Sequence, residues 1–185
     1  MPISNSPQNI AKVNKVNELY KGSLFSFNTE DVILPNGRRA EIAMVRHPGS
    51  TAVVPLSGEK TVILERQYRH PVAEYLFEIP AGTIEPGESP VDCARRELEE
   101  ETGYVADELI ELARLDMIPA YSDEKIYLYL ARGLTPTQQN LDMDEIIEVL
   151  EFPLELALEM TVNGQITDAL TVLALQRAWF HLKAE

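Results

Sequence analysis

Short segments in which apolar and polar residues alternate run through most of the chain, and such alternation predicts β-strands. A first hairpin is predicted by SLFSFNTEDVILPNGRRAEIAMVRHPG, whose two alternating halves flank Pro35-Asn36-Gly37. A second is predicted by STAVVPL and TVILERQYR, which flank Ser57-Gly58-Glu59-Lys60. The further strand-like runs are YLFEIPAG, LIELARLDMI, KIYLYLARGL and IIEVLEFPL. We therefore expect a strand-rich fold with at least two hairpins.

Helical periodicity appears in the middle and at the end of the chain. SPVDCARRELEEET predicts a helix that Ser89 caps, with Pro90 at its first position and Gly103 just past its end. Residues 153–161 predict a short helix, and residues 166–182 predict a long amphipathic one. Strands first, one helix among them and helices at the end predict an α+β fold, layered as an α/β/α sandwich.

The first 22 residues are polar and show no periodicity. They predict a loose N-terminal arm over residues 1–22, ahead of a single domain over residues 23–185. Within that domain, residues 23–48 are expected to form an N-terminal sheet. The length of 185 residues, of which 45% are apolar, suits one domain with a sizeable core.

Charge and cysteine content narrow the range of partners. The chain has 16 Lys and Arg against 30 Asp and Glu, a formal net charge of -14, which argues against a nucleic-acid or anionic-membrane partner. A phosphorylated small molecule stays compatible, because bound cations reverse the local sign of a site. No apolar run has the length of a membrane span or a signal peptide. Cys93 is the single cysteine, so no internal disulfide forms, and we expect a cytoplasmic protein.

The central helix carries unusual charge. Projected at about 100° per residue, its core-facing side carries Val91, Ala94 and Leu98. An adjoining arc carries one arginine and three glutamates: Arg96, Glu97, Glu100 and Glu101. The solvent-facing side carries Asp92, Arg95 and Glu99. The acidic residues are therefore divided between two faces, and three of them converge beside the core.

Two interpretations of this acidic arc are open. Like charges at i,i+3 and i,i+4 repel by a few tenths of a kcal/mol, and a hard divalent cation, Mg²⁺ or Mn²⁺, would compensate them with carboxylate ligands. The preceding loop PAGTIEPGE turns at Gly82 and Gly87 and is suited to present the Ala81 carbonyl to the same cation. The alternative is a solvated helix face whose glutamates pair with arginines and lysines.

The spacing of these residues resembles the Nudix box. Gly82, Glu88, Arg96-Glu97-Leu98, Glu100-Glu101 and Gly103 match every fixed position of that motif. The resemblance implies a Nudix fold, with a mixed sheet between helices, and a Mg²⁺-dependent hydrolase of a nucleoside diphosphate linked to another group. It implies that Glu97, Glu100, Glu101 and the Ala81 carbonyl bind the metal, with Glu100 also catalytic. It also implies that Arg96 and Glu88 orient the metal-binding glutamates.

The flanking segments resemble the ADP-ribose pyrophosphatase branch of this family. They are VRHPGSTAVVPL, LERQYRHPV, YLFEIPAGTIEPGE and YSDEKIYLYLAR. The implied reaction splits ADP-ribose into AMP and ribose 5-phosphate. Ala120-Tyr121 stands where relatives often have a Pro-Gly pair, so other substrates stay open: GDP-mannose, NADH or a dinucleoside polyphosphate. A non-catalytic module that senses a nucleotide is the alternative from another class.

The same resemblance implies further residues of the site. Arg69 is expected to contact the substrate's phosphates, with Arg66 as a weaker candidate, and Glu78 is expected near the site. Glu145, with Asp142 and Asp144 as substitutes, matches the acidic loop that approaches the metals or the attacking water. For each, the plainer alternative is a surface ion pair, a structural hydrogen bond or a solvated turn. Members of this branch often dimerise through an exchanged N-terminal sheet, so a homodimer is expected.

Overall fold

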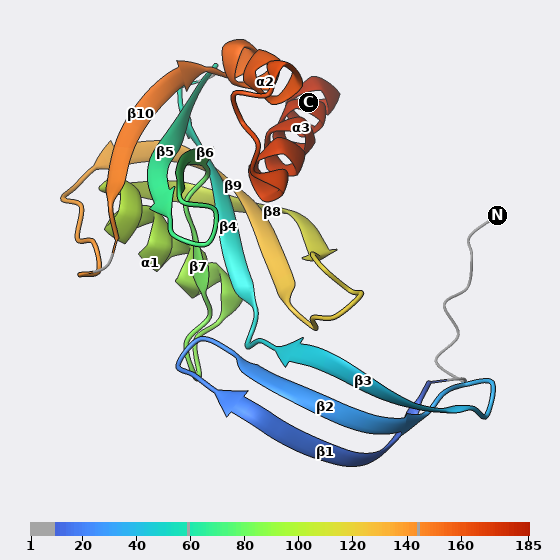
Figure 1. Cartoon of the computed structure of the whole chain (residues 1–185). Helices are drawn as coiled ribbons and strands as arrows, with labels where there is room; N and C mark the ends of the chain where they lie inside the picture. Colours follow the sequence, from blue (N-terminus) through green and yellow to red (C-terminus); the bar gives the residue numbers. More distant parts are fainter. Residues whose placement is uncertain (1–9, 59, 144) are drawn as a thin grey trace. The chain divides into compact units, whose positions relative to one another are not determined.

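The computed structural model describes residues 10–58, 60–143 and 145–185. The chain divides into two units, which Figure 1 draws with their strands and helices. The first unit runs to Pro48 and includes Ile118–Glu124, and the second comprises Gly49–Met117 and Lys125–Glu185. The predictions made for residues 1–9, Glu59 and Asp144 lie outside the described residues.

The first unit is an antiparallel sheet of three strands in the order β1-β2-β3. Its strands are β1 (Lys12–Lys21), β2 (Ser26–Ile33) and β3 (Arg39–Arg46). The predicted hairpin between β2 and β3 is confirmed: Leu34 N–H donates to the Arg38 carbonyl at 2.8 Å, and Gly37 has a φ of 80°. Residues 118–124 join this unit through Val45, whose N–H donates to the Tyr121 carbonyl at 2.8 Å.

The prediction of a loose arm is wrong for residues 12–21, because these residues form β1. The strand pairs with β2 from Lys12 opposite Ile33 to Lys21 opposite Ser26. Nearly all of its side chains are exposed. A strand with water on both faces needs no alternation of apolar and polar residues, so the usual sequence signal is missing.

The second unit is built on a mixed sheet of seven strands. The strand order is β10-β5-β4-β9-β8, with β6 on β5 and β7 on β4. The strands are β4 (Ser50–Ser57), β5 (Thr61–Arg69), β6 (Glu74–Glu78), β7 (Ala81–Thr83), β8 (Tyr104–Asp116), β9 (Lys125–Pro136) and β10 (Ile147–Pro153). Strands β4 and β9 run parallel, whereas the other paired strands of this unit are antiparallel. The second predicted hairpin is the β4–β5 pair.

Helices cover both faces of this sheet, which confirms the α/β/α layering. They are α1 (Pro90–Thr102), α2 (Leu154–Asn163) and α3 (Ala169–Ala184). Val53 of β4 packs with Ala94 and Leu98 of α1. The next residue, Val54, belongs to the cluster that contains the buried residues of α2 and α3. Because successive side chains of a strand point to opposite faces, α1 lies on one face of the sheet and α2 and α3 lie on the other.

The helix boundaries follow their capping residues. The Ser89 side chain accepts from the Asp92 N–H, and Gly103 closes α1 in the left-handed conformation with a φ of 70°. The long terminal helix begins at Ala169, three residues later than predicted, because the Asp168 side chain accepts from the Thr171 N–H at 2.7 Å and caps it there. None of the helices that the structure describes is long and apolar enough to cross a membrane.

Candidate active site

The acidic arc of α1 lies at the border of the core. Glu97 is 8% exposed and Glu101 is 3% exposed, whereas Glu99 faces solvent. Glu100 is half-buried between them. The prediction that the glutamates divide between two faces is confirmed. Leu98 and Ala94 are both fully buried, and their packing determines which glutamates of α1 face inward.

Arg96 links the loop before α1 to the arc. Its guanidinium donates to both carboxylate oxygens of Glu88, at 2.9 and 3.1 Å. It also donates to Glu97 Oε1 at 2.7 Å and to Glu100 Oε2 at 3.0 Å. The hydrogen bonds from Arg96 lower the pKa of Glu88 to about 2. One arginine therefore holds three carboxylates in fixed positions.

The loop of β7 touches the acidic arc through its backbone. The Ala81 N–H donates to Glu101 Oε2 at 2.8 Å. A Cβ placed on Gly82 would stand 1.9 Å from Glu97 Oε1, so glycine is required for this close approach. The backbone of residues 81–82 thus lies directly against two of the three predicted metal-binding glutamates.

The sheet contributes a second group of charged residues. Leu64 of β5 packs in the core beneath α2 and α3, so the alternation of the strand turns Glu65 and Arg69 toward the α1 face. Arg69 forks around Glu78 of β6, with contacts of 2.6 and 3.1 Å to Oε2. Glu78 lies directly opposite Glu65 in the β5–β6 register. Glu65 is 1% exposed.

The loop before β10 brings Glu145 near this group. Glu145 is half-buried, and its carboxylate accepts from the Asp142 N–H at 2.9 Å, whereas Asp142 itself is exposed. The charge of Glu145 contributes to raising the pKa of Glu97 and of Glu101. The acidic loop and the acidic arc therefore act on one another electrostatically.

Burial and mutual repulsion dominate the titration of the cluster. Burial raises the pKa of Glu97 to about 6 although Arg96 opposes the shift, and Glu100 and Glu145 add to it. Burial, followed by repulsion from neighbouring carboxylates, also holds the pKa values of Glu65 and Glu101 well above their usual range. So many oxygen donors around so little positive charge suit a hard divalent cation. Glu97 and Glu100 turn toward Arg96, and within the described chain no three acidic, His or Cys side chains converge on one point.

A family model for the NUDIX domain matches residues 46–170, which include α1, the β7 loop and Glu145. The chain belongs to the Nudix family. This family uses a divalent metal such as Mg²⁺, which agrees with the donor set described above.

Two relatives and one solved structure resemble this Nudix chain along most of its length. The ADP-ribose pyrophosphatase of Bacillus subtilis (strain 168) is 38% identical over 161 residues, 86% of this chain and 87% of the relative. The methanol dehydrogenase activator of Bacillus methanolicus is 38% identical over 167 residues, 89% and 90% of the two chains. The crystal structure of an ADP compounds hydrolase superposes with a TM-score of 0.83 at 27% identity, covering 98% of each chain.

Arg66 does not join the Nudix site. It is exposed and points to the opposite face of β5 from Glu65. There it stacks on Tyr75, with its guanidinium carbon 4.4 Å from the ring centroid, and lies 3.4 Å from Glu148. These contacts match the surface ion pair that was the alternative for this residue.

Glu65 lies on the same face of the sheet as Arg69 and Glu78 and was not predicted from the sequence. The signal was present, because an ionisable residue follows the apolar run Val62-Ile63-Leu64 in a strand with neighbours on both edges. Such a position is normally apolar, since burying a carboxylate without a partner costs free energy.

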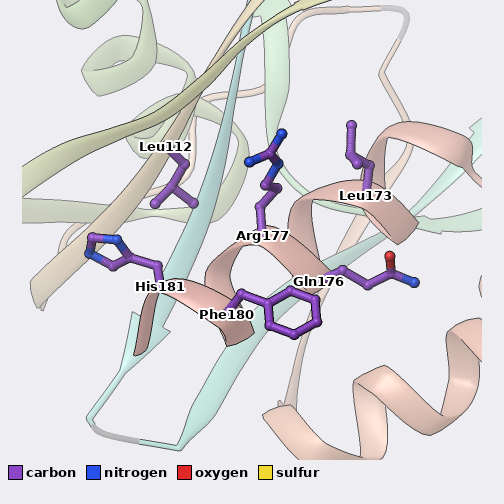
Figure 2. A pocket seen from close by; sticks show the side chains of 6 residues that line it. All are labelled: Leu112, Leu173, Gln176, Arg177, Phe180 and His181. Atoms are coloured by element: carbon purple, nitrogen blue, oxygen red, sulfur yellow. The ribbon is translucent and has the colours of Figure 1, made fainter. Parts of the chain in front are cut away.

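A hollow of about 520 Å³ lies on the other side of the Nudix sheet. Figure 2 shows that its lining comes from one helix and one strand. The lining residues are Leu112 of β8 and Leu173, Gln176, Arg177, Phe180 and His181 of α3. Among the described residues no carboxylate lines it, so its chemistry does not suit a divalent cation.

Proposed function

We propose that this Nudix enzyme hydrolyses the pyrophosphate bond of ADP-ribose, with Mg²⁺ as its cation, and releases AMP and ribose 5-phosphate. The observation that carries the proposal is the partly buried group of charged residues formed by the α1 glutamates, Glu145 and Arg69. The similarity to the Bacillus subtilis ADP-ribose pyrophosphatase supports the substrate. A relative with a different name has the same identity, so overall similarity does not choose the substrate, and a direct measurement is needed.

The acidic arc provides the cation ligands in this proposal. Glu97, Glu100 and Glu101 supply carboxylate oxygens, and the backbone beside Glu101 supplies the Ala81 carbonyl. When bound, Mg²⁺ (or Mn²⁺) neutralises phosphate oxygens and lowers the pKa of a coordinated water. Arg96 and Glu88 hold the glutamates in position, so these two residues act on the metal through its ligands.

The remaining polar residues act on water and substrate. Glu145 sits on a loop whose charge reaches Glu97 and Glu101, and its carboxylate accepts the proton of the attacking water. Arg69 is only partly buried, and its guanidinium binds the substrate's phosphate oxygens, for which a planar fork is better suited than an ammonium group. Glu78 keeps Arg69 in place through the contacts described above.

A panel of substrates tests the proposed activity. ADP-ribose, GDP-mannose, NADH and diadenosine polyphosphates are incubated with the enzyme and Mg²⁺, and products are separated by chromatography. We expect the highest kcat/KM with ADP-ribose, formation of AMP and ribose 5-phosphate, and no turnover in EDTA. Equal rates across the panel would remove the substrate assignment. Tight binding of ADP-ribose without turnover would favour the nucleotide-sensing alternative.

We also propose that the chain forms a homodimer through its first unit. Large apolar side chains of this unit stand at least one third exposed, and burying such a surface against a second copy is favourable. They are Val13, Val16, Leu19, Tyr20, Leu24, Phe25, Phe27 and Ile42.

The acidic surface supports a small-molecule substrate and no nucleic-acid partner. The single, buried Cys93 suits a cytoplasmic enzyme, where thiols stay reduced.

A further inference from the structure

No hydrogen bond among the described residues accounts for the burial of Glu65. It is 1% exposed, and its Oε1 atom has no hydrogen-bond partner among the described residues. Leaving a buried carboxylate oxygen unpaired is destabilising, and such atoms are rare in folded proteins. A side chain that serves only packing at this position would be apolar, like its neighbours Ile63 and Leu64.

The charged residues around Glu65 are mostly acidic. Glu78, Glu145 and Glu97 all act on it with negative charge, and Arg69 is the cation that opposes them. Arg69 already forks around Glu78. Glu78 also stands directly across from Glu65 on the neighbouring strand, and like charges in that arrangement are destabilising. Arg69 is thus shared between Glu78, which it contacts directly, and Glu65, which it affects only through its charge.

The side chain is directed into the acidic cluster. By alternation along β5 it projects to the face of the sheet on which α1 lies, and Glu101 is the most buried glutamate of α1, at 3% exposed. Glu101 is held on one oxygen by the Ala81 N–H. Glu65 and Glu101 are therefore the two most buried acidic residues among those that the structure describes on this side of the sheet, one on a strand and one on a helix.

We propose that Glu65 is an additional carboxylate ligand of the divalent-cation site, at its buried end beside Glu101. This inference rests on the proposed function, because it assumes that the α1 glutamates bind a cation. A cation held there satisfies the unpaired oxygen and offsets the repulsion from Glu78 and Glu101. Carboxylates are the ligands that Mg²⁺ and Mn²⁺ prefer.

Binding of Mn²⁺, followed by electron paramagnetic resonance without substrate, tests the inference. We expect Glu65→Gln to weaken Mn²⁺ binding by about tenfold or more, or to remove one ion per chain. Glu101→Gln reports on the proposed metal site itself and is expected to weaken binding as well. Glu30→Gln is the matched control, because Glu30 is equally a buried strand glutamate but pairs with Arg46 in the first unit. It should bind Mn²⁺ like the wild type.

Thermal unfolding provides a second readout. Glu65→Gln is expected to leave the metal-free Tm unchanged or raise it, since it removes an unpaired buried carboxylate, and to reduce the rise in Tm that Mn²⁺ produces. A structural carboxyl that never meets the metal would leave that rise unchanged. Wild-type Mn²⁺ binding in Glu65→Gln together with weakened binding in Glu101→Gln would overturn the inference and leave the proposed function intact. Wild-type binding in both variants would overturn the proposed metal site as well.

Discussion

At the scale of single residues, the site is organised by how each carboxylate is compensated. Arg96 holds Glu88, Glu97 and Glu100 by direct hydrogen bonds. Glu101 relies on a backbone N–H, and one oxygen of Glu65 has no partner among the described residues. The more deeply a carboxylate is buried, the fewer hydrogen bonds and positive charges compensate its charge. This mismatch supports the proposal that a cation binds at the buried end.

Gly82→Ala tests how closely the backbone must approach Glu97. The new Cβ would stand 1.9 Å from Glu97 Oε1, and Glu97 must move because its side-chain end is more flexible than the backbone. We expect kcat/KM to fall by about tenfold or more with little change in Tm. Gly87→Ala is the control: its Cβ meets nothing within 4 Å, but its φ is +87°. It should lose about 1 kcal/mol of stability and keep its activity. The reverse pattern would contradict the assigned role of Gly82.

The pKa of Glu97 gives a pH dependence with opposite signs for folding and for metal binding. Its folded pKa of about 6 lies above the ordinary 4.5. Its contribution to metal-free stability is therefore complete below about pH 4.5 and lost as the pH rises through about 6. Metal binding requires the deprotonated carboxylate, so Mn²⁺ affinity should rise between about pH 5 and about pH 7. Titration calorimetry measures the Mn²⁺ affinity at each pH, and the affinity of Glu97→Gln should depend less on pH. An affinity that falls over this range would refute the assignment.

Arg69 and Arg66 offer a matched comparison on one strand. Arg69 shares the α1 face with the acidic cluster, whereas Arg66 stacks on Tyr75 away from it. Losing a charge-assisted contact to phosphate costs about 1.5–3 kcal/mol, so Arg69→Ala should lower kcat/KM by about tenfold or more. Arg66→Ala removes only exposed contacts, which are worth little, so its kcat/KM should stay within about twofold of the wild-type value. Steady-state kinetics with ADP-ribose decide, and equal losses in both variants would contradict the assignment of Arg69.

At the scale of elements, α1 could be predicted from the sequence almost completely. Ser89, Pro90 and Gly103 mark its ends, and Ala94 and Leu98 determine which glutamates face inward. Its role in the site was predicted because all the relevant residues lie within one helix and its preceding loop. β1 was missed for a different reason, because its pairing with β2 is not revealed by the local sequence. For Glu65 the apolar run before it was a signal, but its burial also depends on the strands at both edges of β5. Arg66 and Arg69 likewise share a strand but not a face.

Thr171 anchors α3 to the segment that leads into the β7 loop. Its hydroxyl is fully buried and accepts from the Ile79 N–H at 3.0 Å. Thr171→Val keeps the shape but leaves that N–H unpaired, so we expect the free energy of unfolding to fall by about 1–3 kcal/mol. Urea denaturation measures the change. An unchanged midpoint would show that the hydrogen bond does not contribute to stability.

At the scale of the whole molecule, the two units divide the proposed tasks. The residues proposed for catalysis all lie in the second unit, and the exposed apolar side chains proposed for dimerisation lie in the first. The sequence predicted a sheet at residues 23–48 but not the third strand. β1 is exposed on nearly all its side chains, which suits a strand that meets a second copy of the chain.

Leu19→Glu tests the dimer proposal. Leu19 is 59% exposed on β1, so the folded unit tolerates a charge there, whereas an apolar interface does not. Light scattering should give twice the chain mass for the wild type and the single-chain mass for Leu19→Glu. Lys15→Glu changes an exposed polar residue of the same strand and is the control; it should remain dimeric. A wild type that stays monomeric at micromolar concentration would exclude the proposal.

The most direct test of the central claim is kcat for ADP-ribose in Glu100→Gln against Glu99→Gln. The two residues are neighbours on α1, but Glu100 lies on the acidic arc and Glu99 faces solvent. We predict that Glu100→Gln keeps its fold and loses about two orders of magnitude or more in kcat, while Glu99→Gln matches the wild type. Unaltered turnover in Glu100→Gln would contradict the account, because the acidic arc would then not be the metal site.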